Sequence, residues 1–352
     1  MSIVLTVAVT VIVFGLLIFI HELGHYLVAR AFGVGIIEFS VGMGPKIKTW
    51  HGKYNDFSIR ALPIGGFVNM VGEYDDEIPE EHVYKFPLNS KAVWKRMLIV
   101  LAGPFMNILL AFVLMTGIVV SEPVLGSTVV ASFLENAESQ DHGLQEGDEI
   151  IEINGKAIHC YSDMSYKIVA DGVDPVTMVV IRDGEKVTLT DVVFKTETES
   201  GVLVGAQDFK VYVKEKTFLN VLDESFWRSC STVYITVDTL IDTFSGRYGL
   251  DGVGGPVAIG GQVGEVIGES ESFLDAVRRI VTLATLISVS LGVANLLPLP
   301  VLDGGRFVLY VIEAIRRKPL PKKIEQGIMA ACTIVLLVFM IVITLKDIIG
   351  LF

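Results

Sequence analysis

The sequence predicts a multi-pass α-helical membrane protein with four transmembrane helices, a membrane-associated β-hairpin and an inserted β-rich domain. Three observations support this fold class. The 352 residues are 51% hydrophobic and only 19% charged. The apolar residues are concentrated in four blocks that reach or approach the roughly 20 residues needed to cross a bilayer. Between the second and third blocks, short alternating runs are separated by turn residues, which is typical of a β-rich domain.

The four apolar blocks cover residues 2–20, 97–120, 280–302 and 328–345. The first block has no positively charged start and no small-residue cleavage site after it. We therefore interpret it as a retained transmembrane helix, with a cleaved secretory signal or a simple anchor as the alternatives.

The net charge of −12 is unevenly distributed along the chain. Acidic residues outnumber basic ones by more than two to one in residues 121–275, whereas basic residues gather before the second block and in RRKPLPKK, residues 316–323. Short loops rich in Lys and Arg stay in the cytoplasm, so we expect these basic connections inside and the acidic stretch and both termini outside. Arg278 and Arg279 oppose this orientation unless they snorkel from an interfacial helix.

The segment after the first block predicts two strands. KIKTW, the polar turn HGKYND and FSIRALPIGGFVNM follow one another in residues 46–70. This order of apolar run, turn and apolar run is typical of a hairpin. Because open strand edges are not tolerated against lipid, we expect the helices to shield the hairpin or the hairpin to lie at the headgroup level.

The long polar stretch predicts a small domain followed by a helix and a loop. INGK and RDGEK are two-strand connectors, and SYKIVADG lies between them as a helix. FWRSCSTVYITVDTLIDTFSG is an amphipathic helix, and the glycine-rich GLDGVGGPVAIGGQVGE is a loop without the lysine of a phosphate-binding loop. The predicted divisions are residues 1–120, 121–210, 211–275 and 276–352.

Several classes of site are not supported by the composition. The three cysteines lie far apart without CxxC spacing, so neither a disulfide framework nor a thiolate zinc site is indicated. No basic face suited to nucleic acid is present, so we expect no nucleic-acid partner.

The motif HELGH, residues 21–25, ends the first apolar block. Its histidines are four residues apart, so they lie one turn apart on one helix face and can reach a single zinc ion. Glu22 between them can take a proton from the attacking water and pass it to the leaving amine. An isolated match is often accidental. Three ionisable side chains at the end of an apolar span are costly, however, and indicate a functional metal site.

A catalytic zinc site needs a third protein ligand and an open position. The other four histidines lie in polar segments outside the apolar blocks, which leaves three candidates at the same depth: Asp303, Asn107 and Asn295. We favour Asp303, because Pro298 and Pro300 interrupt the preceding helix. A helix cap is the alternative role for Asp303.

Three motifs together resemble the site-2 protease family of zinc-dependent intramembrane proteases. They are HELGH, GPFMNILLA at residues 103–111 and NLLPLPVLDGG at residues 295–305. Their order and spacing are similar to the bacterial branch that contains the regulator-of-sigma-E protease, and the resemblance covers essentially the whole chain. It implies that His21, His25 and Asp303 hold zinc, with Glu22 as the general acid/base.

The resemblance also implies residues that bind substrate. Asn107 and Asn295 match asparagines that face the substrate in this family; for each, an interhelical hydrogen bond is the alternative. The segment Gly65, Gly66 and Phe67 resembles the family's membrane-associated hairpin, where an unwound substrate adds as a strand.

The predicted β-rich domain resembles a PDZ domain through GLQEGDEIIEINGKAI, residues 143–158. By position, its peptide-binding loop would lie near residues 124–128. The chain has room for one such domain, which is similar to the branch found in Gram-positive bacteria, whereas the Gram-negative relative carries two in tandem.

We therefore expect a zinc metalloendopeptidase of the bacterial cell membrane that cleaves transmembrane segments, such as those of pre-trimmed anti-sigma factors or remnant signal peptides. The PDZ-like domain would lie outside the cell and the zinc toward the cytoplasmic side. Expected partners are transmembrane protein substrates, the lipid bilayer and a peptide or protein ligand of the PDZ-like domain. The intact motifs disfavour a non-catalytic PDZ-containing membrane adaptor. The apolar surroundings of the ligands disfavour a metallopeptidase that cuts exposed loops.

Overall fold

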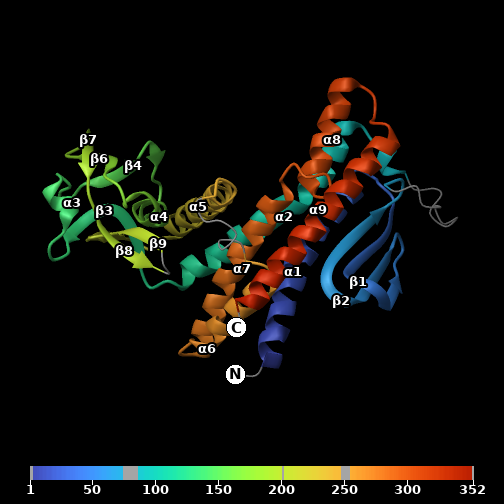
Figure 1. The fold of residues 1–352 in the computed structure, drawn as a ribbon, viewed down its shortest axis with the longest axis horizontal. Helices are drawn as coiled ribbons and strands as arrows, with labels where there is room; N and C mark the ends of the chain where they lie inside the picture. Colours follow the sequence, from blue (N-terminus) through green and yellow to red (C-terminus); the bar gives the residue numbers. More distant parts are fainter. Residues whose placement is uncertain (1–2, 74–85, 200–201, 247–253, 351–352) are drawn as a thin grey trace. The chain divides into compact units, whose positions relative to one another are not determined.

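The computed structural model describes residues 3–73, 86–199, 202–246 and 254–350. The chain divides into two compact units. The first contains Met1–Leu114 and Val233–Phe352, and the second contains Met115–Thr232. The colours of Figure 1 follow the chain through both units.

Four described helices are long and apolar enough to cross a membrane, as the sequence predicts. They are α1 (Ile3–Ala31), α2 (Val93–Ser121), α7 (Phe273–Asn295) and α9 (Lys322–Ile349). The third apolar block was expected to continue to residue 302, but α7 ends at Asn295. The residues that follow form turns because they contain Pro298 and Pro300, which cannot donate helical hydrogen bonds.

Four of the described helices were not predicted. Helix α8 (Asp303–Arg316) follows the turns after α7, and a short 3₁₀ helix (Leu88–Ser90) precedes α2. The glycine-rich stretch was expected to be a loop, and this prediction is wrong for its second half, which forms α6 (Pro256–Gly268). Residues 249–253 of that stretch lie outside the described residues.

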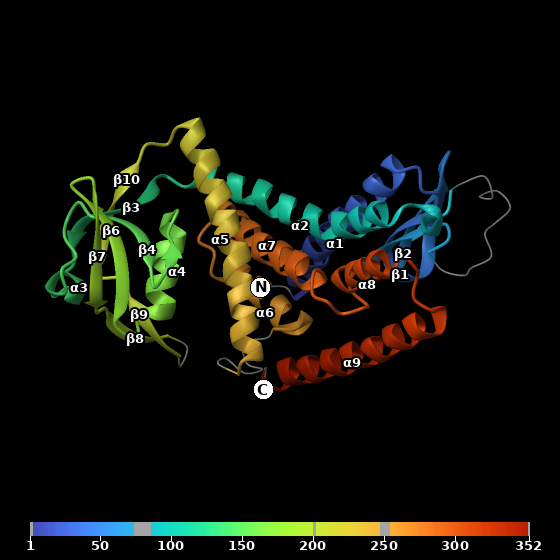
Figure 2. The ribbon, with the colours of Figure 1, turned by 90° about the horizontal axis from the view of Figure 1, so that it is seen from above.

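Helix α6 forms because other helices support it. The buried Asp347 carboxylate of α9 accepts hydrogen bonds from the backbone N–H groups of Gly255, at 2.9 Å, and Ala258, at 3.1 Å. A carboxylate at this position satisfies N–H donors that the first helical turn leaves free. Its negative charge is also stabilised by the positive end of the helix dipole. Helix α6 also packs against α1 and α7, and Figure 2 shows it between α7 and the C-terminal end of α9.

The predicted hairpin consists of β1 (Ile36–His51) and β2 (Asp56–Met70), which are paired in an antiparallel sheet. Phe39 is paired with both Phe57 and Val68, so the first part of β1 lies between two segments of β2. Both strands pack against α1, as Figure 1 shows, and their apolar side chains share a core with Ala29 and Ile99. The hairpin is therefore anchored to the helix that carries HELGH.

A buried acidic side chain stabilises this pairing. Burial raises the pKa of the Glu38 carboxyl, but hydrogen bonds from Ser58, Lys46 and Arg60 outweigh it and hold the pKa below its usual value. The Glu38 carboxylate lies 3.0 Å from the Lys46 ammonium and 2.9 Å from the Arg60 guanidinium. Since all four side chains belong to β1 and β2, a register slip would leave a buried charge without partners.

The second unit is built on a sheet in the order β10-β3-β4-β6-β7. Its strands are β3 (Leu125–Phe133), β4 (Glu149–Ile153), β6 (Val176–Arg182), β7 (Glu185–Val192) and β10 (Phe209–Lys214). The short strand β5 (Lys156–Ala157) pairs with β4, and β8 (Lys195–Glu199) pairs with β9 (Val202–Ala206). The helices are α3 (Glu138–Asp141), α4 (Tyr161–Asp171) and α5 (Phe218–Phe244), which continues into the first unit.

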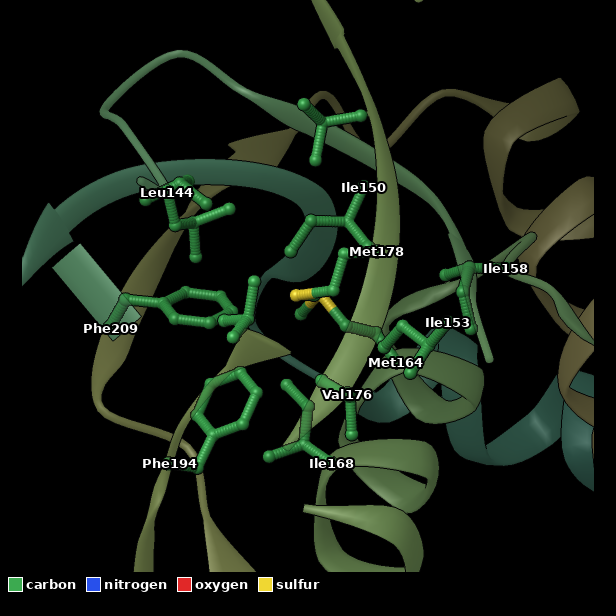
Figure 3. Close-up of a cluster of buried hydrophobic side chains, with 13 residues drawn as sticks. Leu144, Ile150, Ile153, Ile158, Met164, Ile168, Val176, Met178, Phe194 and Phe209 are labelled. Carbon is green, nitrogen blue, oxygen red and sulfur yellow. The ribbon is translucent and has the colours of Figure 1, made fainter. Parts of the chain in front are cut away.

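The two predicted connectors form tight turns. Asn154 and Gly155 have φ values of 48° and 76° between β4 and β5, and Asp183 and Gly184 have 52° and 84° between β6 and β7. Positive φ at both central residues is the geometry that Asn-Gly and Asp-Gly favour in two-residue hairpins. The strands that these turns connect cover a buried hydrophobic core that includes Met164, Met178 and Phe209 (Figure 3).

The loop expected to bind peptide, residues 124–128, is partly covered by its own unit. Leu125 is buried with Val119 and Val221, and the ring of Tyr161 lies against Gly126. The PDZ-like interpretation and its peptide ligand therefore stay predictions.

The cysteines of the second unit give a test of this packing. Cys160 is fully buried, and burial is the largest of the causes that raise the pKa of its thiol to about 12. Cys230 is exposed. Because the thiolate is the reactive form, we expect maleimide at pH 7.5 to label Cys230 and to label Cys160 only after unfolding. Mass spectrometry of peptides measures both; equal labelling rates in the native protein would contradict the packed core.

Candidate metal centre

Two histidines of α1 form one side of the candidate site. His21 and His25 are one helical turn apart, and both are buried, with 7% and 8% of their surface exposed. Their Nε2 atoms lie 3.3 Å apart. Both nitrogens therefore face the same point, as the HELGH spacing predicts.

Asp303, the first residue of α8, forms the other side. Its Oδ2 lies 3.1 Å from Nε2 of His21 and 3.3 Å from Nε2 of His25. A tetrahedral zinc ion with bonds of about 2.0–2.1 Å separates its ligand atoms by about 3.3–3.4 Å. The three side chains are thus close to the spacing that zinc requires, and they are a cluster of possible ligands within the described residues.

The Asp303 carboxylate also indicates a missing partner. Its Oδ2 is buried and has no well-aligned hydrogen bond among the described residues, although two imidazole nitrogens face it. A buried carboxylate oxygen without a donor is costly. The donor set of two imidazoles and one carboxylate, with this unsatisfied oxygen, fits a zinc ion.

Glycines allow the surrounding backbone to approach. A side chain at Gly103 of α2 would overlap the imidazole of His25, and one at Gly24 would overlap the backbone carbonyl of Ala102. On the other side, side chains at Gly304 and Gly305 would overlap the carbonyls of the turns after α7. The glycines of all three sequence motifs therefore allow close packing around the candidate ligands, against an imidazole at Gly103 and against backbone at the other three positions.

Glu22 lies between the two histidines in sequence and is half-buried. It is not part of the ligand cluster. Strand β2 passes beside it: a Cβ added at Gly66 would lie 3.1 Å from Cγ of Glu22 and 3.0 Å from the carbonyl oxygen of Ser40. The structure thus brings one predicted hairpin residue to the predicted acid/base.

The other predicted substrate residues occupy different positions. Gly65 has a φ of 85°, and Phe67 lies under the guanidinium of Arg60, which is 4.8 Å from the ring centroid. Asn295 is half-buried at the C-terminal end of α7. Asn107 is fully buried, and its amide lies 3.1 Å from Nδ1 of His21. The substrate-binding roles of all these residues stay predictions.

Sequence reasoning missed the residues that hold α8. Arg96 of α2 donates two hydrogen bonds to the Glu313 carboxylate, at 2.6 and 3.0 Å, and its guanidinium lies 4.9 Å from the ring centroid of Tyr310. Arg306 forms an ion pair with Glu73 after β2. These side chains line a cavity of about 520 Å³. In the sequence, residues 306, 310 and 313 are spaced so that they share one face of a helix. This spacing does not identify the residues that they contact.

The approach of α2 to the ligands gives the first prediction for the site. Gly103→Ala should abolish zinc binding, because the added methyl group overlaps the imidazole of His25. Gly117→Ala is the matched control, since a Cβ at this position of the same helix meets no atom within 4 Å. Metal analysis of the purified proteins measures the effect, and stoichiometric zinc in Gly103→Ala would contradict the site.

The second prediction concerns the attachment of α8. Glu313→Gln leaves the largely buried Arg96 charge without its partner, which should cost about 3–5 kcal/mol of stability and lower zinc retention through Asp303. Exchanging the charges, Arg96→Glu with Glu313→Arg, should recover part of the loss. Arg316→Gln on the exposed side of α8 should change stability by less than about 0.5 kcal/mol. Thermal unfolding in detergent tests this, and equal effects of the two single variants would refute it.

Comparison with known proteins supports a peptidase. The model of peptidase family M50 matches residues 9–340. A Fusobacterium nucleatum protein is 33% identical over 99% of this chain and 100% of its own length. Zinc metalloprotease RasP of Bacillus licheniformis is 29% identical, and regulator of sigma-W protease RasP of Bacillus subtilis is 28% identical. Each of these two alignments covers 99% of both chains.

Proposed function

The chain belongs to peptidase family M50, the site-2 protease family of membrane zinc metalloproteases, and we propose that it hydrolyses peptide bonds within the transmembrane segments of other membrane proteins. The observation that carries this proposal is the position of the ligand cluster. His21 and His25 belong to an apolar helix long enough to cross a membrane, and both are buried. A hydrolytic site on a membrane-spanning helix suits a substrate that is itself embedded in the bilayer.

His21, His25 and Asp303 would hold the zinc ion. When bound, the ion supplies Lewis-acid chemistry that activates water and polarises a carbonyl group. Glu22 takes the proton of the attacking water and donates it to the amine of the leaving product. Its half-buried position next to the cluster supports this role, because the carboxylate can reach a reacting group without occupying a ligand position.

The substrate must be extended at the cleaved bond, because helical peptide bonds are shielded by their own hydrogen bonds. The segment of β2 around Gly66 supports such a conformation, since it lies beside Glu22 and strand addition would satisfy the backbone of an unwound substrate. We assign Gly65, Gly66 and Phe67 to this substrate contact. Asn295, at the end of α7 and eight residues before Asp303, is assigned to it as well.

We assign anti-sigma factors and remnant signal peptides as substrate classes. The name of the Bacillus subtilis relative, a regulator of sigma-W, supports the first class. The basic clusters support an orientation with the zinc site toward the cytoplasm and residues 121–210 outside the cell. In this orientation the PDZ-like domain admits substrates whose outer domain has been removed.

Glu22→Gln tests the catalytic assignment. The variant should fold and retain about one zinc per chain, because the ligands are unchanged, and should lose proteolysis, because the amide cannot accept the proton. Asp303→Ala is the comparison variant and should lose both zinc and activity. Mass spectrometry of membranes from cells expressing Glu22→Gln should reveal accumulated, uncut substrates; substantial turnover by this variant would reject the role of Glu22.

Two variants test the orientation of the chain in the membrane and the proposed selection of pre-trimmed substrates by the PDZ-like domain. A cysteine introduced at the exposed Asp183 should react with a membrane-impermeant probe from outside the cell. Deleting residues 127–209 should leave zinc binding intact and relax the requirement for pre-trimmed substrates. Labelling only from the cytoplasm would reject the orientation, and a deletion variant that still requires trimmed substrates would reject the filter.

A further inference from the structure

Asn107 of α2 occupies an unusual position beside the ligand cluster. It is fully buried, and its backbone carbonyl accepts a hydrogen bond of 2.8 Å from the Ser288 hydroxyl of α7. Its side-chain nitrogen lies 3.1 Å from Nδ1 of His21. Its Oδ1 is buried and has no hydrogen-bond partner among the described residues.

The chemistry of His21 determines which amide atom should face it. Nε2 of His21 faces Asp303 and His25, so it is the nitrogen that would bind zinc. A neutral imidazole that binds a metal through Nε2 carries its proton on Nδ1. An N–H at Nδ1 needs an acceptor, and the amide nitrogen of Asn107 is a donor. A half-turn of the amide exchanges its oxygen and nitrogen without moving other atoms, and their assignment follows from hydrogen bonding. The half-turn places Oδ1 about 3 Å from Nδ1 of His21, which is an ordinary distance for an N–H···O hydrogen bond.

We propose that Asn107 is a positioning residue that accepts the Nδ1–H of His21 through Oδ1 and so fixes the tautomer and ring orientation of a zinc ligand. This inference rests on the proposed zinc site. Metal-binding histidines usually donate their second N–H to such an acceptor, and its loss weakens metal binding. The role differs from the substrate contact that the family resemblance implies for Asn107.

The second histidine has a matching partner. Nδ1 of His25 lies 2.8 Å from the backbone carbonyl oxygen of Ile99, which is also in α2. One helix thus supplies an acceptor for each zinc-binding imidazole. Because a backbone carbonyl cannot be lost by substitution and an amide can, Asn107 is the partner that mutation can remove.

The test measures the affinity of the full chain in detergent for zinc alone, by competition with a chelator. Asn107→Leu keeps the branching of the side chain but removes the acceptor, so we expect zinc affinity to fall by about 10- to 100-fold. Asn107→Asp retains an acceptor oxygen and should keep or exceed wild-type affinity. Thr285→Val is the matched control, because Thr285 is also buried and its hydroxyl, among the described residues, donates to the Val281 carbonyl of its own helix. Cobalt-loaded Asn107→Leu should also show shifted visible absorption bands, which Thr285→Val should not.

Wild-type affinity in Asn107→Leu would overturn the proposal, as would equal losses in the Leu and Asp variants. If Asn107→Leu does not fold, Asn107→Asp decides alone: retained affinity supports the acceptor role and lost affinity rejects it. Failure of the zinc site itself gives a different result, because His21→Ala would then bind zinc as tightly as the wild type.

Discussion

The close approach of α1 and α2 is the constraint on which the candidate site depends. Two apolar helices gain little from hydrophobic burial inside a bilayer, so their association requires tight packing and interhelical hydrogen bonds. Gly24 and Gly103 remove the side chains that would separate these helices at the level of the histidines. Because the two helices are this close, Ile99 and Asn107 of α2 can reach the imidazoles of α1. The packing of the two helices and the orientation of the two histidines are therefore one structural feature.

Asp303, the proposed third ligand, is held by a different kind of interaction. Asp303 follows irregular backbone whose polar groups must be protected from lipid, and Gly304 and Gly305 let α8 begin directly against it. Ion pairs connect the rest of α8 to Arg96 of α2 and to Glu73 after β2. Buried ion pairs contribute little net stability but strongly disfavour arrangements that separate the partners. They suit a helix whose first residue must stay in register with two histidines on another helix.

The sequence predicted those features that local patterns encode. HELGH indicated two ligands because helical spacing alone places His21 and His25 together, and the turns at Asn154 and Asp183 followed from residues that favour positive φ. Helix α6 was missed because its start depends on Asp347, more than 80 residues away in sequence. The Arg96–Glu313 pair and the contact of Gly66 with Glu22 were beyond reach for the same reason. No local pattern identifies a partner that is brought near only by folding.

The central claim is that two imidazoles of α1 and the carboxylate of α8 bind one zinc ion and leave a position open for water. Zinc K-edge X-ray absorption of the purified full-length chain tests it most directly. The account predicts a first shell of nitrogen and oxygen only, at about 2.0–2.2 Å, with the outer-shell scattering of two imidazole rings. A sulfur shell at about 2.3 Å, or a spectrum without imidazole scattering, would contradict it.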